Sequence, residues 1–307
     1  MSISWIHSRR TAREMAVAVL ASSAAVALVA SAATTASATG PASGDRYRSV
    51  SPIIGGTDTP DDAYPFMAAL LKRDGDGAFK HRCGGSLIDP WLVVTAAHCV
   101  AGFEPKDLKV AVGRTVLSDA RQGQVRDIRA SEGKADPGGI IVHPLYKSDS
   151  AYDMAVLELD RPVEGIAPIK LPTAGTDALI RPGQQATVTG WGLTDTKFGH
   201  TPDRLRQVDV PLLSHNECKV SYSSYNDEVN ICAGVEGKDS CNGDSGGPIF
   251  RKVPGRQEPI QIGVVSYGEG CAGQGAPGIY TSLSSAKLWE SLYKSPEGRR
   301  VKQTLGR

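Results

Sequence analysis

The sequence predicts an all-β fold, either a barrel or a sandwich, with one helix near the C-terminus. From residue 53 onward, short runs rich in Val, Ile, Leu and Thr alternate with turns that contain Gly, Pro or Asp, a pattern typical of all-β domains. Apolar residues at helical spacing are scarce before residues 284–294, which include Leu288, Trp289, Leu292 and Tyr293. The expected strands are Phe66–Leu71, Ser86–Ile88, Trp91–Thr95, Leu108–Val112, Ile140–Val142, Met154–Leu159, Ala186–Thr189, Ile249–Phe250, Ile260–Ser266 and Gly278–Thr281.

Length and charge narrow the possible functions. The chain has 307 residues, of which 40% are apolar and 22% charged, enough for one large core or two small ones. The net charge is only +1, which implies no basic face and argues against nucleic acid as a partner.

The first 38 residues have the features of a signal peptide. Arg9, Arg10 and Arg13 precede the Ala/Val/Leu-rich residues 15–30, and a small-residue cleavage site follows at 36–38. A membrane anchor is the less favoured alternative, because the apolar segment is short and rich in Ala and Ser. The pair Arg9-Arg10 could belong to a twin-arginine signal, but the residues after it fit poorly. We therefore expect general secretion to the extracellular space and no membrane association afterwards.

Three further boundaries follow from composition. Residues 39–52 are rich in Pro, Gly and Ser and predict a linker or propeptide. Residues 53–294 form the expected domain, and the prolines at 162–172 suggest a crossing between two halves. The basic, polar tail at 295–307 is expected to be mobile.

The six cysteines all lie in the part of the chain that would be exported, which predicts three disulfides. Spacing alone leaves fifteen ways of pairing six cysteines open. No pair has Cys-x-x-Cys spacing and the chain has no His-x-x-x-His, so we expect no structural metal.

Residues 238–248 (KDSCNGDSGGP) are the stretch most suggestive of chemistry. A serine hydroxyl becomes a nucleophile only when a base takes its proton, and the backbone N–H groups of Gly243 and Ser245 could hold an oxyanion. The stretch also fits the nucleophile-elbow pattern of α/β-hydrolases, in which an acid and then a histidine follow the serine. That class is excluded, because neither histidine nor aspartate occurs after Ser245.

The base must therefore lie upstream of Ser245. His98 is the best candidate, because it follows an apolar run and adjoins Cys99, which would hold it in place. Asp153 directly precedes an apolar strand and could be the buried acid that orients the imidazole. The other candidate bases, with stronger structural or solvated interpretations, are His81, His143, His200 and His215.

Together these segments resemble the trypsin/chymotrypsin family of serine peptidases, over Ile53 to about Trp289. Residues 95–99 (TAAHC), 153–157 (DMAVL) and 243–248 (GDSGGP) match the histidine, aspartate and serine motifs of that family, in its order. The resemblance implies two packed six-stranded antiparallel β-barrels with a C-terminal helix. It also implies a secreted endopeptidase whose Ser245 attacks the peptide carbonyl, with His98 as base and Asp153 as orienting acid.

The resemblance implies a primary specificity pocket with Asp239 at its base. Gly268 and Gly278 match the wall positions, Ser240 could contact a cationic head group, and the segment beginning at Ser266 resembles the one that pairs with the substrate backbone. We therefore expect cleavage of protein or peptide substrates after Arg or Lys. Tyr267 stands where Trp is commoner and Glu269 adds a charge nearby, so the further subsites are open.

Other features are likewise implied by the resemblance. The implied disulfides are Cys83–Cys99, Cys218–Cys232 and Cys241–Cys271. Cleavage before Ile53 would free an ammonium that pairs with Asp244 and completes the site. Relatives usually have Arg or Lys before this bond, whereas here it is Pro52, so another peptidase is the expected activator.

We expect no cofactor, and no calcium at the loop where many relatives use two acids, because the first position is Arg114. A monomer is expected, with protein inhibitors as further partners. Two other classes remain as alternatives: a catalytically silent peptidase-like binding module and a serine esterase. The match of all three motifs disfavours the first, and the pocket acid Asp239 has no purpose in either.

Overall fold

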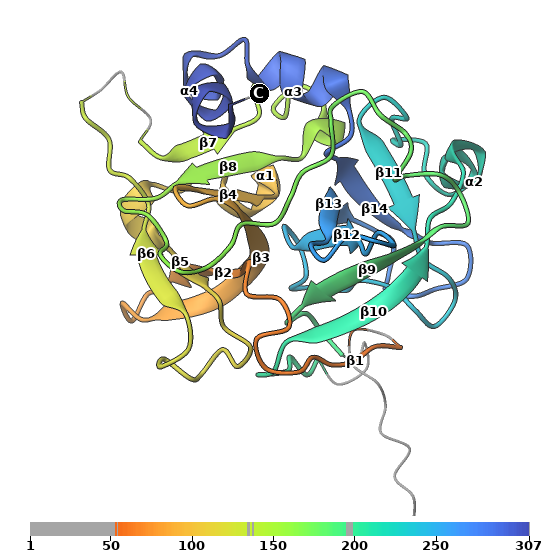
Figure 1. Ribbon diagram of the computed structural model, residues 1–307, viewed down its shortest axis with the longest axis horizontal. Coiled ribbons are helices and arrows are strands. Elements are labelled where there is room, and N and C mark those ends of the chain that lie inside the picture. The colour runs from red at the N-terminus through yellow and green to blue at the C-terminus, as the bar shows by residue number, and fades with distance from the viewer. Residues whose placement is uncertain (1–52, 54, 134–135, 137, 195–198, 307) are drawn as a thin grey trace, which may run out of the picture. The chain divides into compact units, whose positions relative to one another are not determined.

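The chain is organised as two curled antiparallel sheets, seen in the computed structural model of Figure 1. The structure describes residues 53–306 except 54, 134–135, 137 and 195–198, so the predicted signal peptide and propeptide lie outside the described residues. The predicted all-β class is confirmed.

The first sheet has the strand order β6-β5-β2-β3-β4-β8-β7. Its ends close on each other, because Ile128, just after β6, bridges to Leu159, just after β8. The bounds are β2 Met67–Arg73, β3 Phe79–Asp89, β4 Leu92–Thr95, β5 Leu108–Val112, β6 Gln124–Asp127, β7 Ile140–Val142 and β8 Ala155–Glu158.

The second sheet has the order β1-β10-β9-β12-β13-β14-β11. A bridge between Leu212 and Ala233 joins the ends of β10 and β11 and closes the ring. The bounds are β1 Thr57–Asp58, β9 Gln185–Gly190, β10 Arg206–Pro211, β11 Asn230–Ala233, β12 Pro248–Arg251, β13 Ile260–Tyr267 and β14 Gly278–Ser282. The predicted crossing at 162–172 lies within the connection from β8 to β9.

Each sheet has seven strands, one more than the six expected. In the second sheet the extra strand is β1, whose two residues add to the outer edge of β10. In the first sheet β6 and β7 belong to one stretch of chain, interrupted between Asp127 and Ile140, and they pair with opposite ends of the sheet. The observed architecture is therefore the predicted double barrel, and only the number of strands in each sheet differs from the prediction.

The two barrels share packed surfaces, and the site lies where they meet. Phe250, Val264 and Leu283 from the second half belong to the apolar core cluster of the first. Across the junction, Ser86 Oγ donates to Gln261 Oε1 at 2.6 Å and Thr281 Oγ1 donates to the main-chain oxygen of Asp153 at 2.8 Å. These buried hydrogen bonds hold strands of the two barrels against each other, and they therefore fix the positions of the loops that adjoin those strands.

Short helices complete the fold, and the predicted C-terminal helix is confirmed. Leu288, Trp289 and Leu292 on α3 are buried, as their helical spacing requires. In α2 a capping box links Ser214 and Glu217, so that the N–H groups of these two residues are satisfied at its start. The helix bounds are α1 Ala97–Val100, α2 His215–Ser221, α3 Ala286–Leu292 and α4 Pro296–Leu305, and 3₁₀ turns span Pro105–Asp107 and Ser150–Tyr152.

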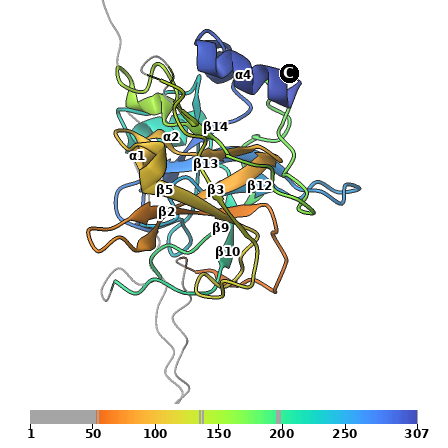
Figure 2. The same ribbon diagram turned by 90° about the vertical axis from the view of Figure 1, so that its left-hand side faces the viewer.

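The prediction of a mobile tail at 295–307 is wrong for residues 295–306, because α4 is a capped helix. Ser295 accepts a hydrogen bond from the Gly298 N–H, and Gly306 ends the helix in the left-handed conformation. Val301 is 1% exposed and packs on the core cluster of the first barrel. The helix lies at the edge of the fold, outside the strands (Figures 1 and 2).

Candidate active site

His98 and Asp153 come together although they are 55 residues apart in the sequence. His98 lies in α1, which follows the buried strand β4, and Asp153 lies two residues before β8, which pairs with β4. The His98 N–H donates to Asp153 Oδ1 at 2.9 Å, and Nδ1 lies 2.7 Å from Oδ2. The carboxylate side chain is 5% exposed and the imidazole 33% exposed. The buried Asp153 carboxylate therefore holds the imidazole of His98, which itself remains partly exposed.

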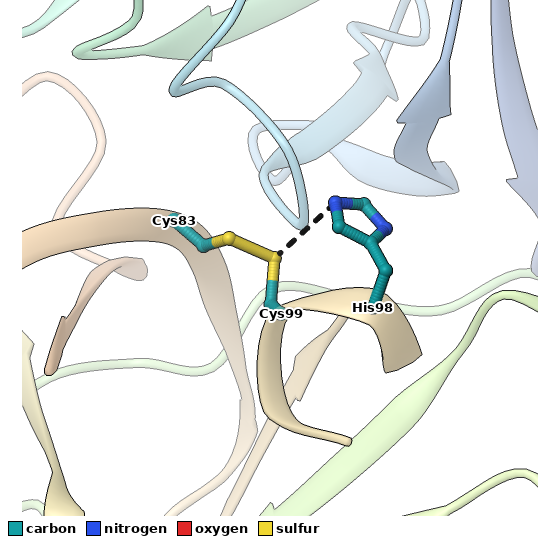
Figure 3. A group of neighbouring side chains, drawn as sticks. All are labelled: Cys83, His98 and Cys99. Atoms are coloured by element: carbon teal, nitrogen blue, oxygen red, sulfur yellow. Dashed lines mark hydrogen bonds between the residues drawn. A yellow bond between two sulfur atoms is a disulfide. The ribbon is translucent and has the colours of Figure 1, made fainter. Parts of the chain in front are cut away.

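The hydrogen bond to Asp153 also fixes the histidine tautomer. An ionised carboxylate can only accept, so Nδ1 carries the proton and Nε2 keeps its lone pair. The neighbour of Nε2 is the sulfur of Cys99 at 3.6 Å (Figure 3). This sulfur is in the disulfide with Cys83 and has no proton to donate. His98 Nε2 thus remains free to accept a proton.

Ser245 lies close to the same disulfide. Its main-chain oxygen is 3.7 Å from the Cys99 sulfur and accepts a hydrogen bond from the Gly84 N–H at 2.8 Å. No hydrogen bond joins its hydroxyl to His98 Nε2 among the described residues. Such contacts are often long in free enzymes and shorten when substrate binds.

The loop around Ser245 needs glycine at two points, one before and one after the serine. Gly243 has φ +99°, and a Cβ there would meet the Cα of Gly192 at 2.9 Å. Gly246 has φ +80°, and a Cβ there would meet Thr95 Oγ1 at 2.2 Å. In the described part of the chain, neither the N–H of Gly243 nor that of Ser245 has a hydrogen-bond acceptor. Two unpaired donors on a rigid loop are what an oxyanion site requires.

A cavity of about 210 Å³ opens beside Ser245. Asp239 lies in it and is 2% exposed, with Oδ1 accepting from the Ser240 N–H at 2.7 Å. Burial raises the pKa of Asp239 to about 6, and no described cation pairs with it. The predicted pocket residues line this one cavity, which is bounded by Asp239, Ser240, Cys241, Asn242, Ser245, Val265, Ser266, Tyr267, Gly268 and Gly278.

Gly278 is the position at which this cavity depends most on glycine. A Cβ there would meet Asp239 Oδ1 at 2.7 Å and Ser240 Oγ at 3.1 Å. Any side chain at this position would therefore cover the acid. At Gly268 the nearest atoms to such a Cβ are at 3.7 Å or more, so a Cβ there would make only ordinary van der Waals contacts.

Asp244 is fully buried and also lacks a cationic partner among the described residues. Oδ1 accepts from the Gly192 N–H at 2.8 Å and Oδ2 from the Cys241 N–H at 2.9 Å. Burial raises its pKa to about 7. Ile53 is fully buried in the core of the second barrel, with φ +40°, a conformation that strains a β-branched residue.

Comparison with known proteins gives the same family as the motifs. The family model described as Trypsin matches residues 53–289. The chain belongs to the trypsin family. It is 40% identical over 238 residues to a trypsin from Saccharopolyspora erythraea, covering 76% of this chain and 94% of the relative. It is 36% identical over 249 residues to trypsin-1 of Astacus astacus, covering 77% and 98%.

A third relative is phenoloxidase-activating factor 3 of Holotrichia diomphalia. It is 36% identical over 252 residues, which cover 77% of this chain and 71% of the relative. With two trypsins at comparable identity, this trypsin-family chain is a serine endopeptidase, and proteins are its substrates.

Two contacts in this trypsin-family site were not anticipated from the sequence. Ser266 was predicted only in the substrate-pairing segment, yet its hydroxyl donates to Asp153 Oδ2 at 2.6 Å. Tyr222, at the end of α2, accepts a hydrogen bond from the Glu269 N–H at 2.9 Å. Both contacts join residues far apart in the sequence, and no local pattern marks either one.

The three disulfides are Cys83–Cys99, Cys218–Cys232 and Cys241–Cys271, the pairs that the resemblance implies. Cys83, His98 and Cys99 also lie close enough to suggest a metal site. Both sulfurs are used in a disulfide (Figure 3), so they supply no thiolate ligand. The loop where many relatives place calcium is bridged here by Arg114, whose Nη1 donates to the Leu117 carbonyl at 2.9 Å.

Another cavity, of about 440 Å³, lies elsewhere and includes Tyr64, Pro168 and Lys252. It contains none of the residues that the motifs selected. Across the described ranges, no helix is long and apolar enough to cross a membrane.

Proposed function

We propose that this trypsin-family endopeptidase is secreted as a zymogen and cleaves after Arg or Lys by a Ser-His-Asp acyl-enzyme mechanism. The observation that carries the proposal is the free lone pair of His98 Nε2. It is held by the buried Asp153 carboxylate beside the Ser245 loop and a pocket with a buried acid. Export rests on the sequence of residues 1–38, which supplies the signal.

Catalysis would begin when Ser245 Oγ attacks the substrate carbonyl and its proton passes to His98 Nε2. Asp153 then stabilises the imidazolium through the Nδ1 hydrogen bond. The imidazolium gives the proton to the leaving amine, which departs and leaves an acyl ester on Ser245. Water, deprotonated by the same Nε2, hydrolyses this ester and restores the serine.

The negative oxygen of each tetrahedral intermediate would lie between the N–H groups of Gly243 and Ser245. Neither donor has another acceptor among the described residues, so neither must break a hydrogen bond first. Removal of one such donor costs about 3 kcal/mol of transition-state stabilisation in a comparable site.

Specificity would come from Asp239. A carboxylate that is 2% exposed and has no cationic partner in the described residues is costly to ionise. A substrate Arg or Lys side chain supplies the missing charge, whereas a neutral side chain leaves that cost uncompensated. Gly278 keeps the acid accessible, because any Cβ there would contact it.

Activation would depend on Asp244 for the same electrostatic reason, because its buried carboxylate also lacks a cationic partner among the described residues. Cleavage before Ile53 frees an ammonium, and an ammonium buried next to Asp244 would neutralise the second uncompensated carboxylate. The proposed activator is another peptidase, because Pro52 precedes Ile53. N-terminal sequencing of the active secreted protein tests this step: Ile53 is expected first, and any other residue refutes it.

The proposed function is tested by hydrolysis of an Arg-containing peptide amide by protein that begins at Ile53. Hydrolysis is expected, and both Ser245→Ala and a serine-directed phosphonylating reagent should abolish it. Hydrolysis of esters without amides would support an esterase instead. No hydrolysis of either, with the N-terminus at Ile53, would support a silent binding module.

A further inference from the structure

His143 is a buried histidine to which the proposed mechanism gives no role. It follows β7 directly and is only 1% exposed, which leaves almost no surface for a substrate to contact. A base that never meets a substrate cannot take part in the reaction itself. Its position in the fold, however, places it against the segment that carries Asp153.

His143 contacts the residues on both sides of Asp153. Its N–H donates to the Met154 carbonyl at 2.9 Å, which continues the pairing of β7 with β8 towards Asp153. Its imidazole stacks on the ring of Tyr152, with centroids 4.9 Å apart and an interplanar angle of 24°. One residue thus holds both chain neighbours of the acid.

The imidazole of His143 is in turn anchored to helix α3. Its Nδ1 accepts a hydrogen bond from the Leu145 N–H at 3.2 Å, so its ring proton is on Nε2. Nε2 lies 3.0 Å from the Leu288 carbonyl and 3.1 Å from Ser291 Oγ. The Ser291 hydroxyl donates to the Lys287 carbonyl at 2.6 Å, which leaves its oxygen to accept from His143.

These partners require a neutral imidazole. A proton on Nδ1 would face the Leu145 N–H, which is also a donor, and the hydrogen bond between them would be lost. Burial lowers the pKa of His143, and the hydrogen bond to the Leu288 carbonyl opposes this effect only in part. At neutral pH both ring nitrogens are therefore paired, and the ring is held in one orientation.

We propose that His143 is a positioning residue, which holds the main chain around Asp153 against α3 and so sets where this carboxylate meets His98. The inference rests on the proposed function, because it adds a supporting residue to the same Ser-His-Asp mechanism. His143 acts through Asp153 and touches neither substrate nor Ser245.

Asp153 needs such a support because the groups that bind its carboxylate do not hold its main chain. The carboxylate oxygens are bound by His98 and Ser266. On the main chain, Thr281 of the second barrel donates to the Asp153 oxygen at 2.8 Å. His143 supplies the matching support from the first barrel and α3. A displacement of about 1 Å at a reacting group can cost about a hundredfold in rate.

The test replaces His143 by leucine and by glutamine in protein that begins at Ile53. Leucine has a similar volume but makes no hydrogen bond, whereas glutamine can direct an N–H towards the Leu288 carbonyl. His143→Leu should lower kcat for an Arg peptide amide about tenfold with little change in KM. His143→Gln should recover most of this loss. Active sites are counted with the phosphonylating reagent, so that misfolded protein does not enter kcat.

A second background separates positioning from a purely structural role. Asp153→Asn should itself lower kcat about 10⁴-fold, and its residual activity is measured with an activated Arg ester. His143→Leu should lower kcat no further in this background, because the acid that it positions is gone. Val301→Ala is the control, since it removes another buried contact with the core of the first barrel. It should lower the melting temperature and leave kcat unchanged in both backgrounds.

The outcomes separate the two proposals. If the parent protein hydrolyses no Arg peptide amide, the proposed function itself is wrong. If it does, an unchanged kcat in His143→Leu refutes only the positioning role, as does an equal loss in the Asp153→Asn background or a loss confined to KM.

If the leucine variant does not fold, Ser291→Ala serves for the same comparison. It removes one acceptor of His143 Nε2 and leaves the Leu288 carbonyl in place. A loss of about threefold in kcat is then expected in the parent protein and none in Asp153→Asn. Equal losses in the two backgrounds would refute the positioning role.

Discussion

At Asp153, three donors converge on one buried carboxylate. The His98 N–H, His98 Nδ1 and Ser266 Oγ all lie within 2.9 Å of its oxygens. Hydrogen bonds to a charged group are stronger than neutral ones, so this arrangement holds the imidazole in a single orientation. Ser266 is thus a positioning residue as well as part of the segment predicted to pair with substrate.

Ser266→Ala should lower kcat for a peptide amide about tenfold and leave KM nearly unchanged. The reason is that one charged hydrogen bond is lost while two remain to orient His98. Steady-state kinetics at fixed pH measure the effect, with Ser221→Ala on α2 as a control. A rise in KM at constant kcat would instead assign Ser266 to substrate binding alone.

Asp239 should make cation binding dependent on pH. Burial raises the pKa of this acid to about 6, and only the ionised form attracts a cation. Benzamidine, an aromatic amidinium, should therefore bind tightly above pH 6, and its dissociation constant should rise about tenfold for each pH unit below that value. Fluorescence titration measures it; a dissociation constant that stays flat from pH 7 to 4.5 contradicts the assignment.

At the scale of elements, α4 is the feature that the family resemblance does not cover. The match to the family model ends at residue 289, and α4 begins at Pro296. Arg300 on this helix lies 3.6 Å from Glu158 at the end of β8, and Val301 is buried on the first barrel. The helix therefore ties the C-terminus to the edge of the barrel that carries His98.

Val301→Ala should destabilise the protein by about 2 kcal/mol, because it removes buried apolar surface and leaves a cavity. Since no hydrogen bond or ion pair of the described residues joins α4 to His98, Asp153 or Ser245, kcat/KM should not change. Thermal unfolding measures the loss, and Gln303→Ala on the exposed face of α4 is the control. Equal melting temperatures for Val301→Ala and Gln303→Ala would show that α4 does not stabilise the barrel.

Some helices and strands could be predicted from sequence patterns alone, and others could not. Met154–Leu159 and Ile260–Ser266 were predictable as strands because they are short, mostly apolar segments, rich in Val, Ile or Leu and bounded by turns. Gln124–Asp127 has no apolar pattern and becomes β6 only because β5 pairs with it. The helix α4 was missed because Val301 and Leu305 are its only apolar side chains, in an otherwise charged stretch.

The same contrast holds within the site. His98, Asp153 and Ser245 are marked by local motifs, so their meeting could be anticipated. The contact between Ser266 and Asp153 spans 113 residues and depends on how the two barrels pack, which no local pattern encodes.

At the scale of the whole molecule, the buried acid Asp244 would connect the proposed activation to stability. In the uncleaved chain its pKa is raised to about 7 from an ordinary value of 3.8. A raised pKa means that the folded state favours the protonated acid, so this stability is complete below pH 3.8 and is lost as pH rises through 7. A free ammonium at Ile53 would remove the penalty by pairing with the acid.

Uncleaved Ser245→Ala protein should therefore lose stability, relative to protein that begins at Ile53, by about 4 kcal/mol between pH 4 and 7. Denaturant unfolding of both forms between pH 4 and 7 measures the difference between their free energies of unfolding. Asp239 contributes equally to both forms, so its contribution cancels in this difference. Asp244→Asn should abolish the pH dependence of the difference. Parallel curves for the two forms would contradict a role for Asp244 in activation.

The most direct test of the account is the specificity of Asp239→Ser. In the proposed function, a buried carboxylate with no cationic partner among the described residues selects a cationic side chain for the Ser245 reaction. The ratio of kcat/KM for an Arg peptide amide over a matched norleucine peptide should therefore fall at least a hundredfold in the variant, the loss of a buried charge pair. An undiminished preference for Arg and Lys would contradict it.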